Sequence, residues 1–165
     1  QEQKLYLVLQ SIKDEVVFVE NAIYFTIGNL QWTKVDDGDD SVSYSPGWLT
    51  WKGHPYYKQT AHYSREAGAA ATFTFSGTKA RFYGCKRNDL GIVDIAVDGQ
   101  VKATLDLYQP SREYVKLYDT DELPPGNHTL EVKVTGKKHR DSVNHYVIVD
   151  AFGFARTEAQ GEDKN

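Results

Sequence analysis

Four polar segments of this 165-residue chain carry side chains that could bind an acidic or strongly hydrogen-bonding ligand. They occupy residues 60–70, 85–90, 108–112 and 136–143 and are locally basic, although the formal net charge is −4. Arginine presents a planar fork for a carboxylate or sulfate, and asparagine with aspartate can bridge vicinal hydroxyls. A solvated charged face is the alternative interpretation. With the aromatic segment 41–60 included, the expected ligand-binding residues are Trp51, Tyr56, His62, Arg87, Asn88, Tyr108, Arg112, His139 and Arg140.

The aromatic segment 41–60 places tryptophan, tyrosine and histidine among proline and glycine. Two interpretations of its tryptophans are open. Either Trp48 or Trp51 fills one end of a hydrophobic core, or a ring serves as a stacking platform for a sugar, and one tryptophan in each role is a further possibility. The rings that we expect to stack on the apolar face of a pyranose are Trp51, Tyr56 or Tyr108.

The acidic run Asp-Asp-Gly-Asp-Asp at 36–40 predicts a turn. A calcium loop of the EF-hand type needs acids at alternate positions, a central glycine and a distal glutamate, and this run lacks that spacing. We interpret the run as a solvated turn, with an ordered calcium site as the alternative.

Catalytic motifs are sparse in this sequence. It contains neither a Gly-x-Ser-x-Gly elbow nor a His-Glu-x-x-His pair. Its single cysteine, Cys85, lies at the end of an expected strand, where a lone cysteine is more often a small apolar filler than a nucleophile. A glycosidase needs two carboxylates across a cleft, and Asp89, Asp141 and Glu113 leave such a pair conceivable. We therefore expect no enzyme activity, with a small hydrolase as an alternative.

The elements that position these residues are predicted to be strands. Apolar residues alternate at period two between Ala71 and Asp106, and the Asp98-Gly99 pair is a strong hairpin signal, which together indicate antiparallel strands with at least one buried face. The content of 11 tyrosines also suits pleated surfaces better than a helical bundle. The fold class is therefore an all-β, antiparallel β-sandwich, with strands expected at 71–75, 79–83, 91–97, 101–107, 113–118, 127–135 and 144–155.

Each connection between antiparallel strands reverses the chain, so alternate connections lie at the same end of the sandwich. The tight turns at 76–77, 98–99 and 124–126 fall at one end, and the four polar segments fall at the other. Loops on a rigid scaffold are where binding residues tend to lie. We therefore expect the binding site on this polar rim.

The bulk composition limits the partners and the compartment. The acidic net charge does not call for nucleic acid, and no run approaches the roughly 18 apolar residues of a membrane span. One cysteine cannot form an internal disulfide, which leaves the redox compartment open. We divide the chain into 1–35, N-terminal strands or a linker from a preceding domain, 36–155, the β-sandwich, and 156–165, a polar tail.

Segments 62–78, 80–84, 91–99, 123–136 and 147–152 resemble the galactose-binding-like β-sandwich modules that are appended to bacterial glycoside hydrolases. These segments are mainly strand and turn residues, so they are more specific for the sandwich than for its ligand. The resemblance implies a jelly-roll carbohydrate-binding module with its site in the loops at one end. In some relatives a calcium ion is structural or touches the sugar, so the resemblance also admits a structural calcium.

The function expected from these observations is a non-catalytic module that targets an attached glycan-degrading enzyme to its substrate. The expected partners are a glycan or polysaccharide and the attached catalytic domain, in a secreted, periplasmic or cell-surface protein of a bacterium. The alternative is a structural domain that docks onto a neighbouring catalytic domain, with the aromatic segment buried in that interface. Solvent exposure of Trp51 and Tyr56 beside the basic rim distinguishes the two.

Overall fold

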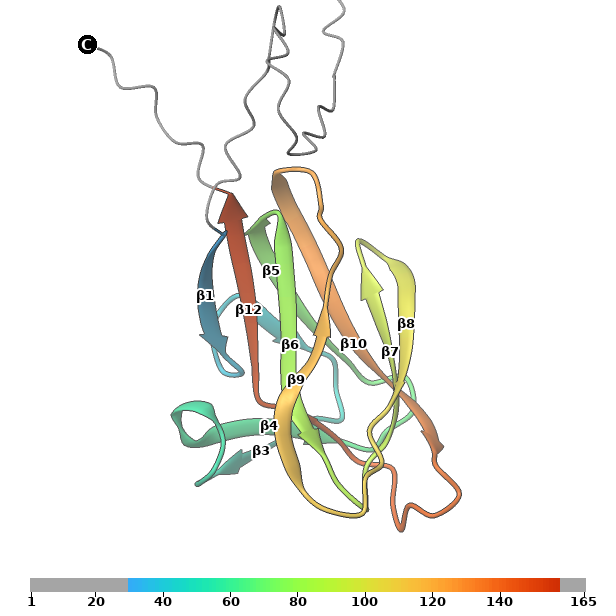
Figure 1. The fold of residues 1–165 in the computed structure, drawn as a ribbon. Helices are drawn as coiled ribbons and strands as arrows, with labels where there is room; N and C mark the ends of the chain where they lie inside the picture. Colours follow the sequence, from blue (N-terminus) through green and yellow to red (C-terminus); the bar gives the residue numbers. More distant parts are fainter. Residues whose placement is uncertain (1–29, 158–165) are drawn as a thin grey trace, which may run out of the picture.

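The computed structural model describes residues 30–157, which fold as an antiparallel β-sandwich (Figure 1). One sheet has four strands in the order β1-β12-β6-β9, and every neighbouring pair in it is antiparallel. Leu30 lies opposite Thr157, so the two ends of the described chain are neighbours. The strands of this sheet are β1 (Leu30–Asp36), β12 (Ala151–Thr157), β6 (Lys79–Lys86) and β9 (Glu113–Asp119).

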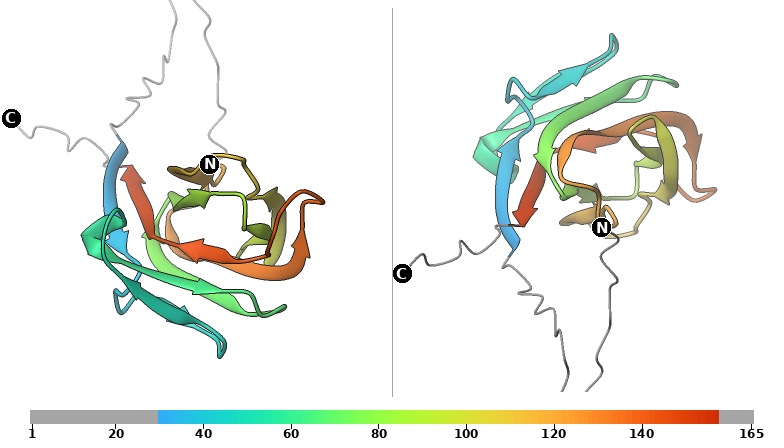
Figure 2. Two further views of the ribbon diagram at one scale, coloured as in Figure 1. Left: turned by 90° about the horizontal axis from the view of Figure 1, so that it is seen from below. Right: turned by 90° about the horizontal axis from the view of Figure 1, so that it is seen from above.

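The second sheet has five strands in the order β2-β5-β10-β7-β8 and faces the first. Figure 2 shows the two layers viewed from either end. Asp98 and Gly99 between β7 and β8 both have positive φ, as the two-residue hairpin turn expected from the sequence requires. The strands of this sheet are β2 (Val42–Tyr44), β5 (Ala70–Gly77), β10 (Gly126–Lys138), β7 (Gly91–Val97) and β8 (Gln100–Asp106).

The core between the sheets is built on phenylalanine rings. Phe73 on β5 stacks on Phe152 on β12 with ring centroids 5.0 Å apart, and Phe82 on β6 lies 5.7 Å from Phe152. All three side chains are almost fully buried. These contacts join the two sheets, and they confirm the all-β sandwich that alternation at period two predicts.

A third, small sheet lies at one end of the sandwich, in the order β11-β4-β3 (Figure 1). Strand β3 forms its outer edge, and all of the β3 residues are exposed. A short 3-10 turn, η1, joins β3 to β4. The elements are β11 (Val147–Val149), β4 (Thr60–Ser64), β3 (Leu49–Lys52) and η1 (Tyr57–Gln59).

The structure corrects three of the expected connections. Segment 60–70, expected as a loop, contains β4, and segment 136–143, expected as a polar loop, begins with the last residues of β10, which ends at Lys138. The run 144–155, expected as one strand, divides at Asp150 into β11 and β12. A strand exists only through its pairing, and β4 pairs with the preceding strand β3 on one side and with β11, from a distant segment, on the other.

The change of sheet at Asp150 has a local cause. The carboxylate of Asp150 is buried and accepts a hydrogen bond of 2.7 Å from the backbone N–H of Tyr57. Burial raises the pKa of this carboxyl group. The residues of β11 and the first residues of β12 are all buried. The sequence is therefore almost continuously apolar here, and it does not indicate that one strand ends and another begins.

The two ends of the sandwich differ as the alternation of connections predicts. At one end, the turn at 76–78 meets the end of β12 through the hydrogen bond from Thr78 N–H to the Ala155 carbonyl, 2.9 Å. At the other end, backbone hydrogen bonds join three of the polar segments, from Gln109 N–H to the Arg87 carbonyl, 3.3 Å, and from Val143 N–H to the Asn88 carbonyl, 3.0 Å. Figure 1 shows the longer loops and the small sheet together at this loop end.

The described residues include 30–35 of the expected N-terminal segment and 156–157 of the expected tail. Residues 1–29 and 158–165 lie outside the description, and with them most of the strands or linker expected at 1–35. The remainder of that segment belongs to β1, which pairs with β12. Within residues 30–157, no helix has the length and hydropathy that crossing a membrane requires.

Candidate ligand-binding site

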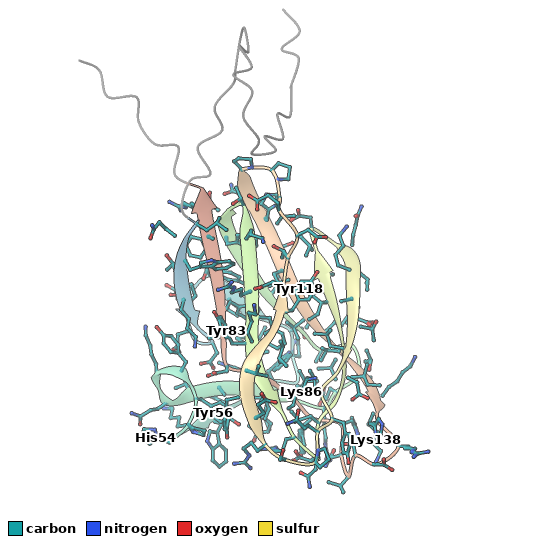
Figure 3. All side chains as sticks on the ribbon, in the orientation of Figure 1. His54, Tyr56, Tyr83, Lys86, Tyr118 and Lys138 are labelled. Carbon is teal, nitrogen blue, oxygen red and sulfur yellow. The ribbon has the colours of Figure 1, made fainter. Side chains whose placement is uncertain are left out.

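A pocket of about 400 Å³ lies over the small sheet at the loop end of the sandwich. This volume is within the usual range for small-ligand pockets. Figure 3 marks two of its lining residues, His54 and Tyr56, beside β4. The full lining consists of Trp51, His54, Pro55, Tyr56, Ala61, Tyr63, Arg87, Arg112, Tyr114, Tyr146 and Ile148.

The floor of the pocket is one face of the small sheet. Residues directly opposite each other on neighbouring antiparallel strands share a face. Leu49 pairs with Tyr63, which pairs in turn with Ile148, and Trp51 pairs with Ala61. Because Trp51 is two residues from Leu49 on β3, both rows of side chains project from the same face.

Tyrosine rings form edge-to-face pairs around this floor. The Tyr56 and Tyr114 ring centroids are 5.5 Å apart with planes at 83°, and those of Tyr63 and Tyr146 are 6.0 Å apart at 68°. Burial, with a smaller contribution from Cys85, raises the pKa of Tyr56 to about 12, so its hydroxyl stays neutral. This hydroxyl makes no hydrogen bond to another residue within 30–157, and it can therefore donate to or accept from a ligand.

The two tryptophans of the aromatic segment take different roles. Trp51 is 53% exposed beside the pocket, whereas Trp48 packs against the core with its ring 5.3 Å from that of Tyr44. Tyr114, which shares the pocket with Trp51, is also exposed. An exposed apolar patch of this kind marks a binding or interaction surface more often than a chance exposure does.

Two guanidinium groups reach the pocket, and they differ in their partners. Arg87 is held by Asp89 in a two-point interaction, from Nε to Oδ1 and from Nη2 to Oδ2, the second of 2.8 Å. Arg112 is exposed and makes no ion pair or hydrogen bond within the described part of the chain. Arg87 is therefore a fixed donor, whereas Arg112 carries a charge that no carboxylate among residues 30–157 neutralises.

Four of the nine expected ligand-binding residues line this pocket: Trp51, Tyr56, Arg87 and Arg112. They come from segments that are far apart in the sequence, and the small sheet and its flanking loops bring them together. Tyr56 is buried in the wall, so of the two rings proposed as exposed markers only Trp51 is open to solvent.

His62, another expected binding residue, lies on the opposite face of the small sheet. Its neighbour Tyr63 points into the pocket, and consecutive residues of a strand face opposite ways. His62 Nδ1 instead donates to the buried Asp37 carboxylate at 2.6 Å, and its ring stacks on Tyr44 with centroids 4.0 Å apart. His62 is thus paired with Asp37 and Tyr44 and does not line the pocket.

The other four expected residues lie at the loop end but outside the pocket lining. The rings of Tyr108 and His139 stack on each other with centroids 4.5 Å apart and planes within 4°. The Asn88 backbone carbonyl accepts hydrogen bonds from the loop between β10 and β11. Arg140 is 88% exposed beside Asp141. The loop end is therefore wider than the pocket, and these residues belong to its rim.

Comparisons with known proteins place the fold. No family model matches the chain. Over 101 residues it is 33% identical to an A type blood N-acetyl-alpha-D-galactosamine deacetylase of Flavonifractor plautii, a match that covers 61% of this chain but only 13% of that enzyme.

Two solved structures share the architecture. The CBM36-1 domain of a multidomain xylanase from the hindgut metagenome of Trinervitermes trinervoides matches with a TM-score of 0.50 at 17% identity, over 74% of this chain and 95% of that domain. A two-domain esterase active on acetylated mannans matches with a TM-score of 0.57 at 14% identity, over 79% of this chain and 38% of the esterase. The described domain has the fold of a carbohydrate-binding module. At these identities the likeness concerns the fold alone.

The pocket of this module fold contains residues that the sequence did not single out as binding residues. Tyr63 lies in the polar segment 60–70, and because that segment was expected as a loop, nothing indicated that Tyr63 and not His62 faces the pocket. A period-two alignment of β4 with β3 is the signal that would have found it. The residues missed were His54, Pro55, Ala61, Tyr63, Tyr114, Tyr146 and Ile148.

The acidic run at 36–40 forms the expected turn, which is solvated at Gly38, Asp39 and Asp40 but not at Asp37. Asp37 is fully buried, because its carboxylate accepts hydrogen bonds from the Thr60 hydroxyl at 2.7 Å and from His62. In the neighbouring Asp36, the carboxylate oxygen Oδ1 is also buried, and it has no hydrogen-bond partner within the described residues. Across residues 30–157, no three His, Cys, Asp or Glu side chains are grouped to hold a metal ion. Calcium also accepts backbone and amide carbonyl oxygens, so the expected calcium site stays a prediction.

Proposed function

We propose that this domain is a non-catalytic carbohydrate-binding module that holds an attached glycan-degrading enzyme at its substrate. The observation that carries the proposal is the half-exposed Trp51 ring at the mouth of a tyrosine-lined pocket, in a fold shared with carbohydrate-binding modules. None of the residues that line the pocket is a carboxylate, serine or cysteine, so it lacks the carboxylate pair of a glycosidase.

In the proposed mechanism, the indole of Trp51 stacks on the apolar face of a pyranose. The Tyr56 hydroxyl and the Arg87 N–H groups that Asp89 does not use then hydrogen-bond the sugar hydroxyls. Because each such hydrogen bond replaces one with water, its net contribution is only about 0.5–1.5 kcal/mol. We therefore expect modest affinity at a single site.

The position of the pocket suits a targeting role. Leu30 and Thr157, the ends of the described chain, are paired at the end of the sandwich opposite the pocket (Figure 1). A domain joined at either point would leave the pocket open to an external glycan. Since the chain spans only 13% of the deacetylase that it resembles, attachment to a larger enzyme is part of this proposal.

The likeness to a Flavonifractor plautii enzyme supports a bacterial protein, and a module that targets polysaccharides would meet them outside the cytoplasm. A secreted, periplasmic or cell-surface location is therefore proposed with the function. Calcium stays a prediction, and the chelator arm of the experiment below tests it.

The proposal is tested by probing a glycan array with the 165-residue chain, with and without a chelator. We expect binding to one class of glycan, and we expect Trp51→Ala to weaken it by about tenfold or more, since a buried aromatic anchor often contributes over 1 kcal/mol. Val101→Ala, which trims an exposed side chain on β8, is the control and should bind normally. Loss of binding on chelation would show that an ion takes part.

A docking domain is the competing function, because Trp51 and Leu49 form an exposed apolar patch that another protein surface could also cover. Docking would be favoured if the chain bound no glycan on a broad array and co-purified with a separately expressed catalytic domain of the parent protein. Loss of that co-purification in Trp51→Ala would place the interface at the patch.

A further inference from the structure

The charge of the pocket lining is opposite to that of the whole chain. The formal net charge of the chain is −4, yet the lining contains the cations Arg87 and Arg112 and the imidazole of His54, and it contains no aspartate or glutamate. A concave site lined by one sign of charge concentrates ligands of the opposite sign. The lining is therefore matched to an anionic group.

The two arginines of the pocket differ in whether a carboxylate compensates their charge. Asp89 takes two N–H groups of Arg87, which fixes the guanidinium and compensates its charge, while its remaining donors stay free. Arg112 has no carboxylate partner within residues 30–157. An anion in the pocket would therefore meet one oriented, neutralised donor group and one uncompensated positive charge.

The aromatic surroundings strengthen this preference. Tyr56 and Tyr114, in edge-to-face contact, line the same pocket as Arg112. Rings around a ligand exclude water, and a charge-assisted hydrogen bond is stronger where water is excluded. Arg112 is itself exposed, which limits the gain because solvent screens an exposed ion pair.

We infer that the pocket selects glycans that carry an anionic substituent, a uronate carboxylate or a sulfate ester, seated against Arg112 with Trp51 stacked on the ring of the same sugar. The inference rests on the proposed function, because it names the ligand class of the same site. It also predicts discrimination against protonated amino sugars, whose ammonium group would face the two arginines.

The experiment is a calorimetric titration of the 165-residue chain with matched sugars. Methyl galacturonide is compared with its methyl ester, and galactose 6-sulfate with galactose, so that within each pair the sugar ring is the same and only one partner carries the anionic group. Galactosamine supplies the opposite charge. We expect the better anion to bind about 5–10-fold more tightly than its neutral partner, with the advantage shrinking at roughly tenfold higher salt. Galactosamine should bind more weakly than galactose.

Substitutions locate the effect. Arg112→Gln should bring the anion and its neutral partner to equal affinity, while binding of the neutral sugar is retained. Arg140→Gln makes the same change of charge on the rim, outside the pocket, and should keep the preference. Both side chains are exposed, so neither change should unfold the domain, and thermal melting checks this.

Each outcome decides between the two proposals. Equal binding of charged and neutral sugars, both lost in Trp51→Ala, would overturn the anion preference and leave the carbohydrate-binding function intact. A preference that survives Arg112→Gln but is lost in Arg140→Gln would place the anion elsewhere and overturn the assignment to this pocket. If neither a neutral nor a charged glycan bound in titration or on the array, the proposed function itself would fail. Preference for the carboxylate or for the sulfate identifies the source of the anion.

Discussion

At the scale of single residues, environment separates side chains of the same type. Trp48 contributes to the core, and its buried indole N–H has no hydrogen-bond partner in the described structure, whereas Trp51 is exposed at the pocket. A buried donor without a partner costs about 1–3 kcal/mol, so Trp48 is held by packing alone. Arg87 and Arg112 likewise share the pocket but not the same charge compensation.

The environment of Cys85 leads to a prediction about its reactivity. Its thiol is fully buried behind the pocket, opposite Tyr114 in the β6–β9 pair, and burial raises its pKa to about 11. The thiolate is the reactive form, so the native protein should react with a thiol reagent at mildly alkaline pH on the order of a hundredfold more slowly than the protein unfolded in urea. Timed labelling read by absorbance measures both rates. Equal rates would show that β6 and β9 open readily.

At the scale of elements, the small sheet decides which residues form the site. Strand β4 receives β3 on one side and β11 on the other, and β11 comes from a segment more than 80 positions further along the chain. Gly84 on β6 permits this packing, because a Cβ there would lie 2.6 Å from the Ile148 carbonyl oxygen. The strand β11, which forms part of the pocket floor, therefore packs directly against β6 of the sandwich.

The turn end contains an element whose stability should depend on pH. His128 on β10 contacts two acceptors, the Pro124 carbonyl through Nε2 and the Asp98 carboxylate through Nδ1, each at 2.7 Å. Both acceptors require an N–H, so the doubly protonated ring fits best, and the Pro124 bond, then the Asp98 bond, raise the pKa of His128. A raised folded-state pKa gives stability that is complete below the unfolded histidine value, about 6.5, and is lost as pH rises through the folded value.

We therefore expect the free energy of unfolding to fall as pH rises from about 6 towards 8, and His128→Gln to remove that part of the slope. Urea denaturation at several pH values measures it. His139→Gln makes the same substitution at the loop end and serves as the control that should keep the slope. If His128→Gln left the pH profile unchanged, the two hydrogen bonds would not favour the charged ring in solution.

At the scale of the whole molecule, one core holds the two sheets together, and the site depends on it from a distance. Phe152 on β12 contacts rings from both sheets, Phe82 on β6 and Phe73 on β5. The same strand follows β11 directly and pairs with β1. Loss of packing at this point would therefore loosen both the sandwich and the support of the small sheet.

Phe152→Ala tests the coupling between the core and the sandwich. Removing this ring should lower the free energy of unfolding by about 3–5 kcal/mol, because it loses buried apolar surface and leaves a cavity. Val101→Ala, at a position 64% exposed, should change it by no more than about 0.5 kcal/mol. Urea denaturation followed by tryptophan fluorescence measures both. A loss under about 1 kcal/mol for Phe152→Ala would mean that the two sheets do not depend on this contact.

The sequence by itself determined the strands that alternate and the turns that join them. Alternation at period two in β5 and β7 and the Asp98-Gly99 turn are local properties, since neighbouring residues of a strand face opposite sides whatever the strand pairs with. The order of connections also indicated which loops meet at one end. Arg87 and Arg112 come from two of these loops, and both line the pocket.

Only the tertiary structure decided which of these residues share a pocket. His62 and Tyr63 are adjacent, and the pairing of β4 with β3 and β11 sends one towards Asp37 and the other into the pocket. The pairing with β11 joins segments more than 80 positions apart, so the local pattern alone does not encode the face that each residue takes. The physical reason is that a one-residue change of register exchanges the two faces of a strand, and register is set by its neighbours.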